Sequence, residues 1–289
     1  MPLNKQAPGL SLSLTGKVAL VTGGSRGIGA ATVRLLRQAG ARVAFSYRDA
    51  EDRALALAAD CGGDASCRAL QQDLATVEDG QALIASASAL WGRLDCLIVN
   101  HGIWPSHNQP IASMSARQWR TTLGINLDSV FGLVQSATAQ MLRQPINSGA
   151  PACPERSRMG LDSETWVPQT PRGHIILIAS TAAQRGEAFH ADYAASKGAL
   201  ISLTKSLSTE LAPQGILCNC IAPGWVRTDM SASTLSDPIT SKKALGPIPL
   251  GRAASPEEIA APIVFLCTPW AGFISGEIWN INGGAVLAG

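Results

Sequence analysis

The chain has 289 residues, of which 46% are hydrophobic and 15% charged, and 23 basic residues stand against 21 acidic ones. This apolar share is ample for a core and excludes a disordered chain. The near-neutral charge argues against a nucleic-acid binder, which needs a basic excess to neutralise phosphates. No apolar run approaches the roughly 18 residues of a membrane span. Residues 1–15 lack the pattern of a secretion signal, and we interpret them as a loose leader.

Short apolar strands alternate with amphipathic helices along the chain. The expected strands are residues 17–22, 43–46, 67–72, 95–99, 174–179, 216–221 and 277–281. The expected helices are residues 30–39, 50–60, 76–90, 115–143, 191–212 and 256–268. Such alternation favours an α/β fold, a doubly wound parallel sheet with helices on both faces. Residues 16–289 are predicted to form this single domain.

Residues 144–172 break the rhythm with five prolines and two glycines. This density of breakers forbids a long helix or strand. The stretch runs from the end of a helix to the start of a strand, whereas ligands collect at the carboxyl ends of strands. We interpret it as a surface insertion away from the chemistry, with a partner-binding or lid element as the alternative.

The seven cysteines show no zinc-binding spacing, so no metal is expected. We interpret them as buried free thiols, which favours a reducing, cytoplasmic location.

A glycine-rich loop, Thr22-Gly23-Gly24-Ser25-Arg26-Gly27-Ile28-Gly29, follows the first strand and opens a helix. Its glycines allow a tight turn, and the helix N-terminus offers N–H groups to a pyrophosphate. The alternative is a glycine turn without a ligand. No acid ends the second strand, where a carboxylate would bind the ribose 2′-hydroxyl of NAD. Arg26 and Arg48 suit a 2′-phosphate instead, so NADP(H) is predicted over NAD(H), unless Arg48 is only a solvated charge.

Tyr193 and Lys197 lie four residues apart at the start of an expected helix, which places both side chains on one face. A free phenol has a pKa of about 10, and a nearby ammonium would lower it and make the phenol a better acid and base. Ser180 ends an apolar strand at the edge where ligands collect, and its hydroxyl could hold a carbonyl oxygen. Alone, Tyr193 would be interpreted as a packing aromatic.

With these pieces in order, the chain resembles the short-chain dehydrogenases/reductases of the single-domain type. The resemblance covers about residues 17–284. The matching pieces are Thr22-Gly23, Gly27-Ile28-Gly29, Asp73-Leu74, Asn100-His101-Gly102, Asn126, Ser180, Tyr193-Ala194-Ala195-Ser196-Lys197 and Pro223-Gly224-Trp225-Val226-Arg227-Thr228.

The resemblance implies a Rossmann-type sheet of seven strands in the order 3-2-1-4-5-6-7, and roles for single residues. It implies that Tyr193 gives a proton to a ketone or takes one from an alcohol, that Lys197 binds the nicotinamide ribose and lowers the Tyr193 pKa, that Ser180 polarises the carbonyl and that Asn126 positions a relay water. The implied coenzyme contacts are Gly23, Ser25, Arg26, Gly27, Ile28, Gly29, Ser46, Arg48, Asp73, Leu74, Asn100, Gly102, Tyr193, Lys197, Pro223, Gly224, Val226 and Thr228.

Three departures from the family pattern stand out. His101 replaces a small residue near the site, where it could touch substrate or merely pack. The 54 residues from Asn126 to Ser180 make that interval about two dozen longer than usual, because of the insertion. Gln214 stands where the carrier-protein reductases of the family tend to carry a basic residue, which puts an acyl-carrier substrate in doubt.

We therefore expect an NADP(H)-dependent carbonyl reductase or alcohol dehydrogenase. The resemblance also implies a homotetramer or homodimer formed through helices 115–143 and 191–212. Trp104, Phe189, His190 and Trp225 could form an aromatic wall for an apolar or aromatic carbonyl compound. Residues 225–252 suggest a mobile lid. The alternatives are a 3-oxoacyl-thioester reductase, an NAD-dependent sugar or alcohol dehydrogenase and a non-catalytic NADP-sensing protein.

Overall fold

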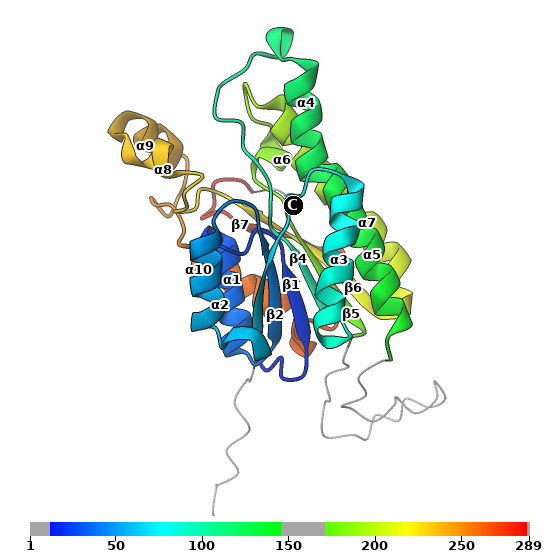
Figure 1. Cartoon of the computed structure of the whole chain (residues 1–289). Coiled ribbons are helices and arrows are strands. Elements are labelled where there is room, and N and C mark those ends of the chain that lie inside the picture. The colour runs from blue at the N-terminus through cyan, green and yellow to red at the C-terminus, as the bar shows by residue number, and fades with distance from the viewer. Residues whose placement is uncertain (1–11, 146–170, 288–289) are drawn as a thin grey trace, which may run out of the picture.

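A single parallel sheet organises the protein, whose computed structural model describes residues 12–145 and 171–287. Its seven strands are ordered β3-β2-β1-β4-β5-β6-β7, which confirms the predicted Rossmann-type topology (Figure 1). The strands are β1 (Val18–Val21), β2 (Arg42–Tyr47), β3 (Cys67–Gln71), β4 (Cys96–Val99), β5 (Gly173–Ile178), β6 (Ile216–Pro223) and β7 (Ile278–Ile281). Each lies within three residues of its expected position.

Helices cover both faces of the sheet (Figure 1). One layer holds α1 (Gly27–Gln38), α2 (Glu51–Asp60) and α10 (Pro256–Leu266), and the other holds α3 (Val77–Trp91), α5 (Ser129–Arg143) and α7 (Ala191–Leu211). The shorter helices α4 (Ala116–Leu123), α6 (Ala182–Arg185), α8 (Ala232–Ser236) and α9 (Pro238–Leu245) rise beyond the carboxyl edge of the sheet, where Figure 1 shows them at the top.

The apolar run in β5 shows why the sheet needs two helical layers. Ile176 and Ile178 belong to the core on the α1–α10 side, whereas Ile175 and Leu177 belong to the core on the α3–α5 side. Alternate residues of a strand point to opposite faces, so a strand that is apolar throughout must be covered on both.

Two expected segments differ in detail from the structure. The helix expected over residues 115–143 is interrupted at Gly124–Asp128 by a π-helical turn, which separates α4 from α5 and carries Asn126. Such a turn leaves no mark in hydrophobic periodicity. The first helix begins at Gly27 rather than Ala30, because Arg26 is its N-cap.

The leader and the insertion fall largely outside the described residues, so both remain predictions. Leu14, within the predicted leader, is buried, and its N–H donates to the Ala39 carbonyl at 2.7 Å. At the insertion, residues 146–170 are not described, but its two ends are joined: the Arg172 Nη1 donates to the Gln144 carbonyl at 3.0 Å.

Six cysteines lie in the described part of the chain and all are free thiols, five of them buried. Within the same residues no cluster of three or more His, Cys, Asp or Glu is arranged to hold a metal ion. No helix described here is both long and apolar enough to cross a membrane.

Candidate active site

The glycine-rich loop lies between the end of β1 and the start of α1. Gly23 and Gly27 have φ angles of 64° and 54°, a region that favours glycine. A Cβ at Gly29 would lie 2.2 Å from the Gly23 carbonyl oxygen, so the loop can bend back over the helix only without a side chain there. The Gly23 N–H donates to the Ser46 Oγ at 3.1 Å, which ties the loop to the end of β2. The predicted residues of the phosphate cradle therefore meet at the N-terminus of α1.

Thr22 fastens this loop to the end of β4. Its Oγ1 accepts the N–H groups of Asn100 at 2.9 Å and His101 at 3.1 Å. The Asn100 side-chain amide donates to the carbonyls of Thr22 and Gly23, at 3.1 and 3.2 Å. The predicted coenzyme residue Asn100 thus supports the glycine loop directly.

The His101 ring is held on both nitrogens. Its Nε2 lies 3.1 Å from the Ile125 carbonyl and 2.9 Å from the Ser129 Oγ, and its Nδ1 lies 2.8 Å from the Thr22 Oγ1. A carbonyl can only accept, so Nε2 carries the proton and Nδ1 accepts from Thr22. Loss of hydration and, second, the Lys197 charge lower the His101 pKa to about 3. Of the two interpretations of His101, the structure supports packing with a satisfied ring.

Asn126, in the π-helical turn, clamps the loop that follows β4. Its Oδ1 accepts the Ile103 N–H at 2.8 Å, and its Nδ2 donates to the Ile103 carbonyl at 3.0 Å and to the Ser196 Oγ at 3.1 Å. A Cβ on Gly102 would lie 3.1 Å from the Asn126 Oδ1 and 3.2 Å from the Lys197 Nζ. Asn126, Gly102 and Lys197 therefore converge, and both protons of the amide are already donated.

Ser180, Tyr193 and Lys197 come together where β5 ends and α7 begins. The Ser180 side chain lies near enough to the Tyr193 phenol to lower the pKa of that phenol. The Lys197 Nζ, one helical turn further, donates to the Ile178 carbonyl at 2.8 Å. Both Tyr193 and Lys197 are buried. The three predicted residues form one group at the carboxyl edge of the sheet, in which Ser180 is half-buried.

Burial sets the proton affinities in this group. It raises the Tyr193 pKa to about 12, while the Ser180 side chain acts in the opposite direction. It lowers the Lys197 pKa to about 8. The expected lowering of the Tyr193 pKa by Lys197 is not seen in the protein alone: desolvation of the phenol dominates, and Lys197 is not among the groups that shift this pKa. Tyr193 is therefore a protonated donor at neutral pH.

Aromatic rings enclose one side of Tyr193. The Trp104 indole stacks on the His190 ring at 4.1 Å and meets Tyr193 edge-on at 4.6 Å. Phe189, by contrast, is exposed, with a φ of 67° that bulky residues rarely adopt. Trp225 follows β6, and no ring contact joins it to the other three among the described residues. Of the four predicted wall residues, Trp104 contacts the tyrosine ring and His190 stacks on Trp104.

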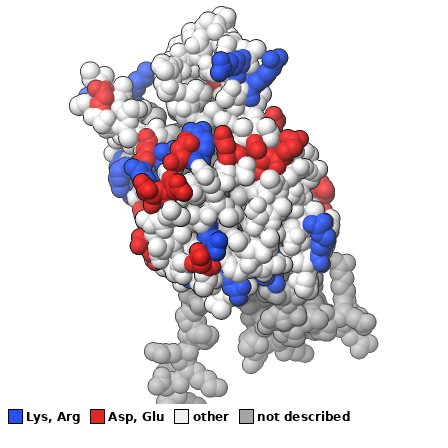
Figure 2. Space-filling model, in the orientation of Figure 1, with Lys and Arg blue, Asp and Glu red and all other residues white. Residues whose placement is uncertain are grey.

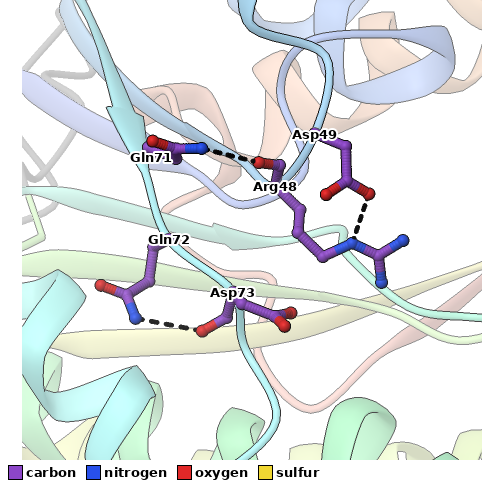
Figure 3. A pocket seen from close by; sticks show the side chains of 5 residues that line it. All are labelled: Arg48, Asp49, Gln71, Gln72 and Asp73. Atoms are coloured by element: carbon purple, nitrogen blue, oxygen red, sulfur yellow. Dashed lines mark hydrogen bonds and ion pairs between the residues drawn. The ribbon is translucent and has the colours of Figure 1, made fainter.

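A cavity of about 580 Å³ lies beside the ends of β2 and β3, lined by Arg48, Asp49, Gln71, Gln72 and Asp73 (Figure 3). It contains two predicted coenzyme residues, Arg48 and Asp73. The Arg48 Nε donates to Asp49 at 2.6 Å. The other arginine predicted to bind the 2′-phosphate is Arg26, whose Nη1 lies 3.6 Å from the Asp229 Oδ2.

The loop after β6 packs on the glycine loop. A Cβ on Gly27 would lie 3.0 Å from the Thr228 Cγ2. Ser231 fixes this turn, since its Oγ accepts the Thr228 N–H at 3.1 Å. Residues 225–252, expected as a lid, contain α8 and α9.

One supporting residue was missed by the sequence interpretation. Asp192 is fully buried and accepts hydrogen bonds from the Thr122 Oγ1 at 2.8 Å, the Gln118 Nε2 at 3.1 Å and the Tyr193 N–H at 2.9 Å. It anchors the first turn of α7 to α4. A single acid beside a tyrosine carries no signal in the sequence, because its two side-chain donors, Thr122 and Gln118, lie about 70 residues away.

A glycine cradle at a helix N-terminus and a Ser-Tyr-Lys group define an oxidoreductase that acts on CH–OH or carbonyl groups with a nicotinamide coenzyme. Residues 17–149 match the family described as short chain dehydrogenase, and residues 164–286 match the family described as Enoyl-(Acyl carrier protein) reductase. The chain belongs to the short-chain dehydrogenase/reductase family, as its sequence predicts.

Relatives with different activities match nearly the whole chain. A 3-oxoacyl-[acyl-carrier-protein] reductase of Synechocystis is 33% identical, over 95% of this chain and 99% of the relative. An L-rhamnose 1-dehydrogenase (NAD(P)(+)) of Azotobacter vinelandii is 32% identical, over 94% of this chain and 97% of the relative.

The fold is also similar to that of solved structures. A dehydrogenase/reductase from Sinorhizobium meliloti has a TM-score of 0.80 and 31% identity, with 96% of this chain and 98% of the other covered. A putative 2-deoxy-d-gluconate 3-dehydrogenase from Agrobacterium tumefaciens with bound NADP has a TM-score of 0.77 and 30% identity, with 95% and 98% covered.

Proposed function

We propose that the protein is an NADP(H)-preferring carbonyl reductase that uses Tyr193 as its general acid. The observation that carries this proposal is the buried phenol of Tyr193, which lies near Ser180 and whose pKa is raised by burial, so that it is protonated at neutral pH. A carbonyl oxygen placed between these hydroxyl groups would receive hydrogen bonds from both. The bound coenzyme would supply the hydride to the carbonyl carbon.

Tyr193 gives its proton to the carbonyl oxygen as the alcohol forms, and a pKa above neutrality keeps the donor form populated. Ser180 holds the same oxygen and strengthens its hydrogen bonding as negative charge develops. Lys197, whose pKa is lowered to about 8, is charged at neutral pH and stabilises the phenolate left behind. Asn126 fixes the loop that carries Gly102, beside Lys197; a water held by its remaining lone pair would extend a proton path.

The residues present fit a dinucleotide. The glycine loop bends back over the N-terminus of α1, a geometry that a Cβ at Gly29 would prevent, and the cavity beside β2 and β3 is large enough for a nucleoside. The glycine loop with Ser25, Arg26 and Ile28 would hold the pyrophosphate end, and Arg48, Asp73 and Leu74 the adenosine end. Arg26 and Arg48 support a preference for the phosphorylated coenzyme.

The substrate end favours a flat apolar or aromatic carbonyl compound, because the Trp104–His190 stack lies against Tyr193. A 3-oxoacyl thioester is the second candidate, favoured by the name of the Synechocystis relative. Sugar oxidation with NAD is a further candidate, since the Azotobacter relative is named a rhamnose dehydrogenase that uses NAD(P)(+).

We also propose a homotetramer or homodimer in the cytoplasm. Phe131 and Leu142 on α5 are exposed apolar side chains on one of the helices expected at the interface. The five buried free thiols accord with a reducing compartment.

The test is a carbonyl panel with NADPH, read by the loss of absorbance of the reduced coenzyme. The panel contains aromatic ketones, an acetoacetyl thioester and sugars in the oxidative direction, each with both nicotinamide coenzymes. We expect the highest kcat/KM with an aromatic ketone and NADPH, and a loss of about 10²–10⁴-fold in Tyr193→Phe.

Tyr47→Phe is the matched control, because Tyr47 is the only other tyrosine and lies in the core at the end of β2. Its turnover should stay near that of the wild type. If Tyr193→Phe turns over normally, the acid assignment is wrong. If the protein binds NADPH tightly yet reduces nothing in the panel, the sensor alternative replaces this proposal.

A further inference from the structure

We propose that Asp49 sets the coenzyme specificity of this protein, by competing with the 2′-phosphate of NADP(H) for the Arg48 guanidinium. The inference deepens the coenzyme preference proposed above and rests on it for the position of the ribose. Asp49 is absent from the contacts that family resemblance implies. It emerges only from the geometry of the cavity at the ends of β2 and β3.

Asp49 already accepts a hydrogen bond from one nitrogen of the Arg48 guanidinium. The Arg48 Nε donates to the Asp49 Oδ2 at 2.6 Å, and Figure 3 shows the two terminal nitrogens of the guanidinium pointing away from that carboxylate. The backbone beneath is fixed, since the Gln71 Nε2 donates to the Arg48 carbonyl at 3.2 Å. Arg48 is 52% exposed and Asp49 73% exposed. An ion pair this exposed adds little to stability, so it can be exchanged for another anion at small cost.

The charge of the cavity opposes a phosphate. Its lining contains one guanidinium, from Arg48, and two carboxylates, from Asp49 and Asp73. Figure 2 shows carboxylates gathered across this face of the molecule, with basic side chains among them at one end. A 2′-phosphate brings nearly two negative charges, whereas the 2′-hydroxyl of NAD brings none. The two carboxylates therefore offset what Arg48 contributes to NADP(H) binding.

Narrow selectivity between the two coenzymes follows from this arrangement. Asp49→Asn removes one negative charge and keeps an oxygen that can accept from the Arg48 Nε, so the guanidinium keeps its orientation. A unit charge a few ångströms from a phosphate, at a site as exposed to water as this one, is worth about tenfold in affinity. We expect Asp49→Asn to tighten NADPH binding about tenfold and to leave NADH binding within about twofold.

The experiment is a fluorescence titration of the full-length protein with NADPH and with NADH, which gives a Kd for each without any turnover. It compares the wild type, Asp49→Asn and Asp52→Asn at about 0.05 M and about 0.5 M salt. Asp52 is the matched control: it is an exposed aspartate in the first turn of α2 and lies outside the cavity lining. The NADPH gain should appear in Asp49→Asn, be much smaller in Asp52→Asn and shrink at high salt.

A second set of variants, made in the Arg48→Gln protein, tests whether Arg48 is required for the effect of Asp49. In Arg48→Gln the gain from Asp49→Asn should fall to about that of Asp52→Asn, because the competition for the guanidinium has gone. Three results would overturn the proposal: weaker NADPH binding in Asp49→Asn, which would make Asp49 an orienting residue; equal effects of the two aspartates; or an unchanged gain without Arg48. The readout is binding, so a failure of catalysis by Tyr193 would leave this result intact.

Discussion

The His101 ring makes the stability of the fold sensitive to acid. Its pKa falls from 6.5 to about 3 on folding, so the unfolded chain binds the extra proton between these values. The folded state accordingly loses stability as the pH drops below 6.5. Protonation would also leave Nδ1 as a donor facing the Thr22 Oγ1, which already accepts two N–H groups. At pH 5, which is 1.5 pH units below 6.5, the loss is about 2 kcal/mol.

The perturbation is His101→Gln, which keeps a side-chain NH₂ in reach of the Ile125 carbonyl but cannot titrate. Urea unfolding at pH 7 and pH 5 gives the free energy of unfolding of each protein. The wild type should lose about 2 kcal/mol more than the variant over this interval. His174, whose pKa is lowered to about 4 by burial, titrates in both proteins and cancels in the difference. Equal losses in the two proteins would refute the argument.

Three further predictions concern the site. Gly29→Ala places a Cβ 2.2 Å from the Gly23 carbonyl oxygen and should cost about 1–3 kcal/mol in urea unfolding and weaken NADPH binding; an unchanged midpoint would count against the cradle. Lys197, with a pKa lowered to about 8, loses its charge above that pH, so the reduction rate should decline from pH 8 upwards; a profile level to pH 9.5 would contradict its role. Asn126→Ala releases Ile103 and should lower kcat by about 10²-fold while the Kd for NADPH stays the same; a parallel loss of coenzyme binding would show a wider collapse.

The sequence predicts most of the fold because its signals are local. The strands are short apolar runs, and the glycine loop and the Tyr193–Lys197 spacing each lie within a few residues. The π-helical turn at Asn126 and the support of Tyr193 by Asp192 escape such reasoning, because their partners are distant in the chain. The hydrogen bond between Arg48 and Asp49 could not be predicted either, because adjacent residues in a sequence need not bond to each other.

The pKa of Tyr193 also could not be predicted from the sequence. Spacing alone predicts that Lys197 lowers the Tyr193 pKa, but it says nothing of how deeply the phenol is buried. Desolvation depends on the packing of α7 against the end of β5, which is a property of the whole fold.

The joined ends of residues 146–170 have a practical meaning for engineering. The Gln144 side chain binds both the N–H and the carbonyl of Leu94, and the Arg172 guanidinium donates to the carbonyls of Leu142 and Gln144. These hydrogen bonds tie the end of α5 and the start of β5 to the rest of the fold independently of residues 146–170. The interval between Gln144 and Arg172 is therefore a suitable place to insert an affinity tag or a reporter domain, because its two ends lie away from the carboxyl edge of the sheet.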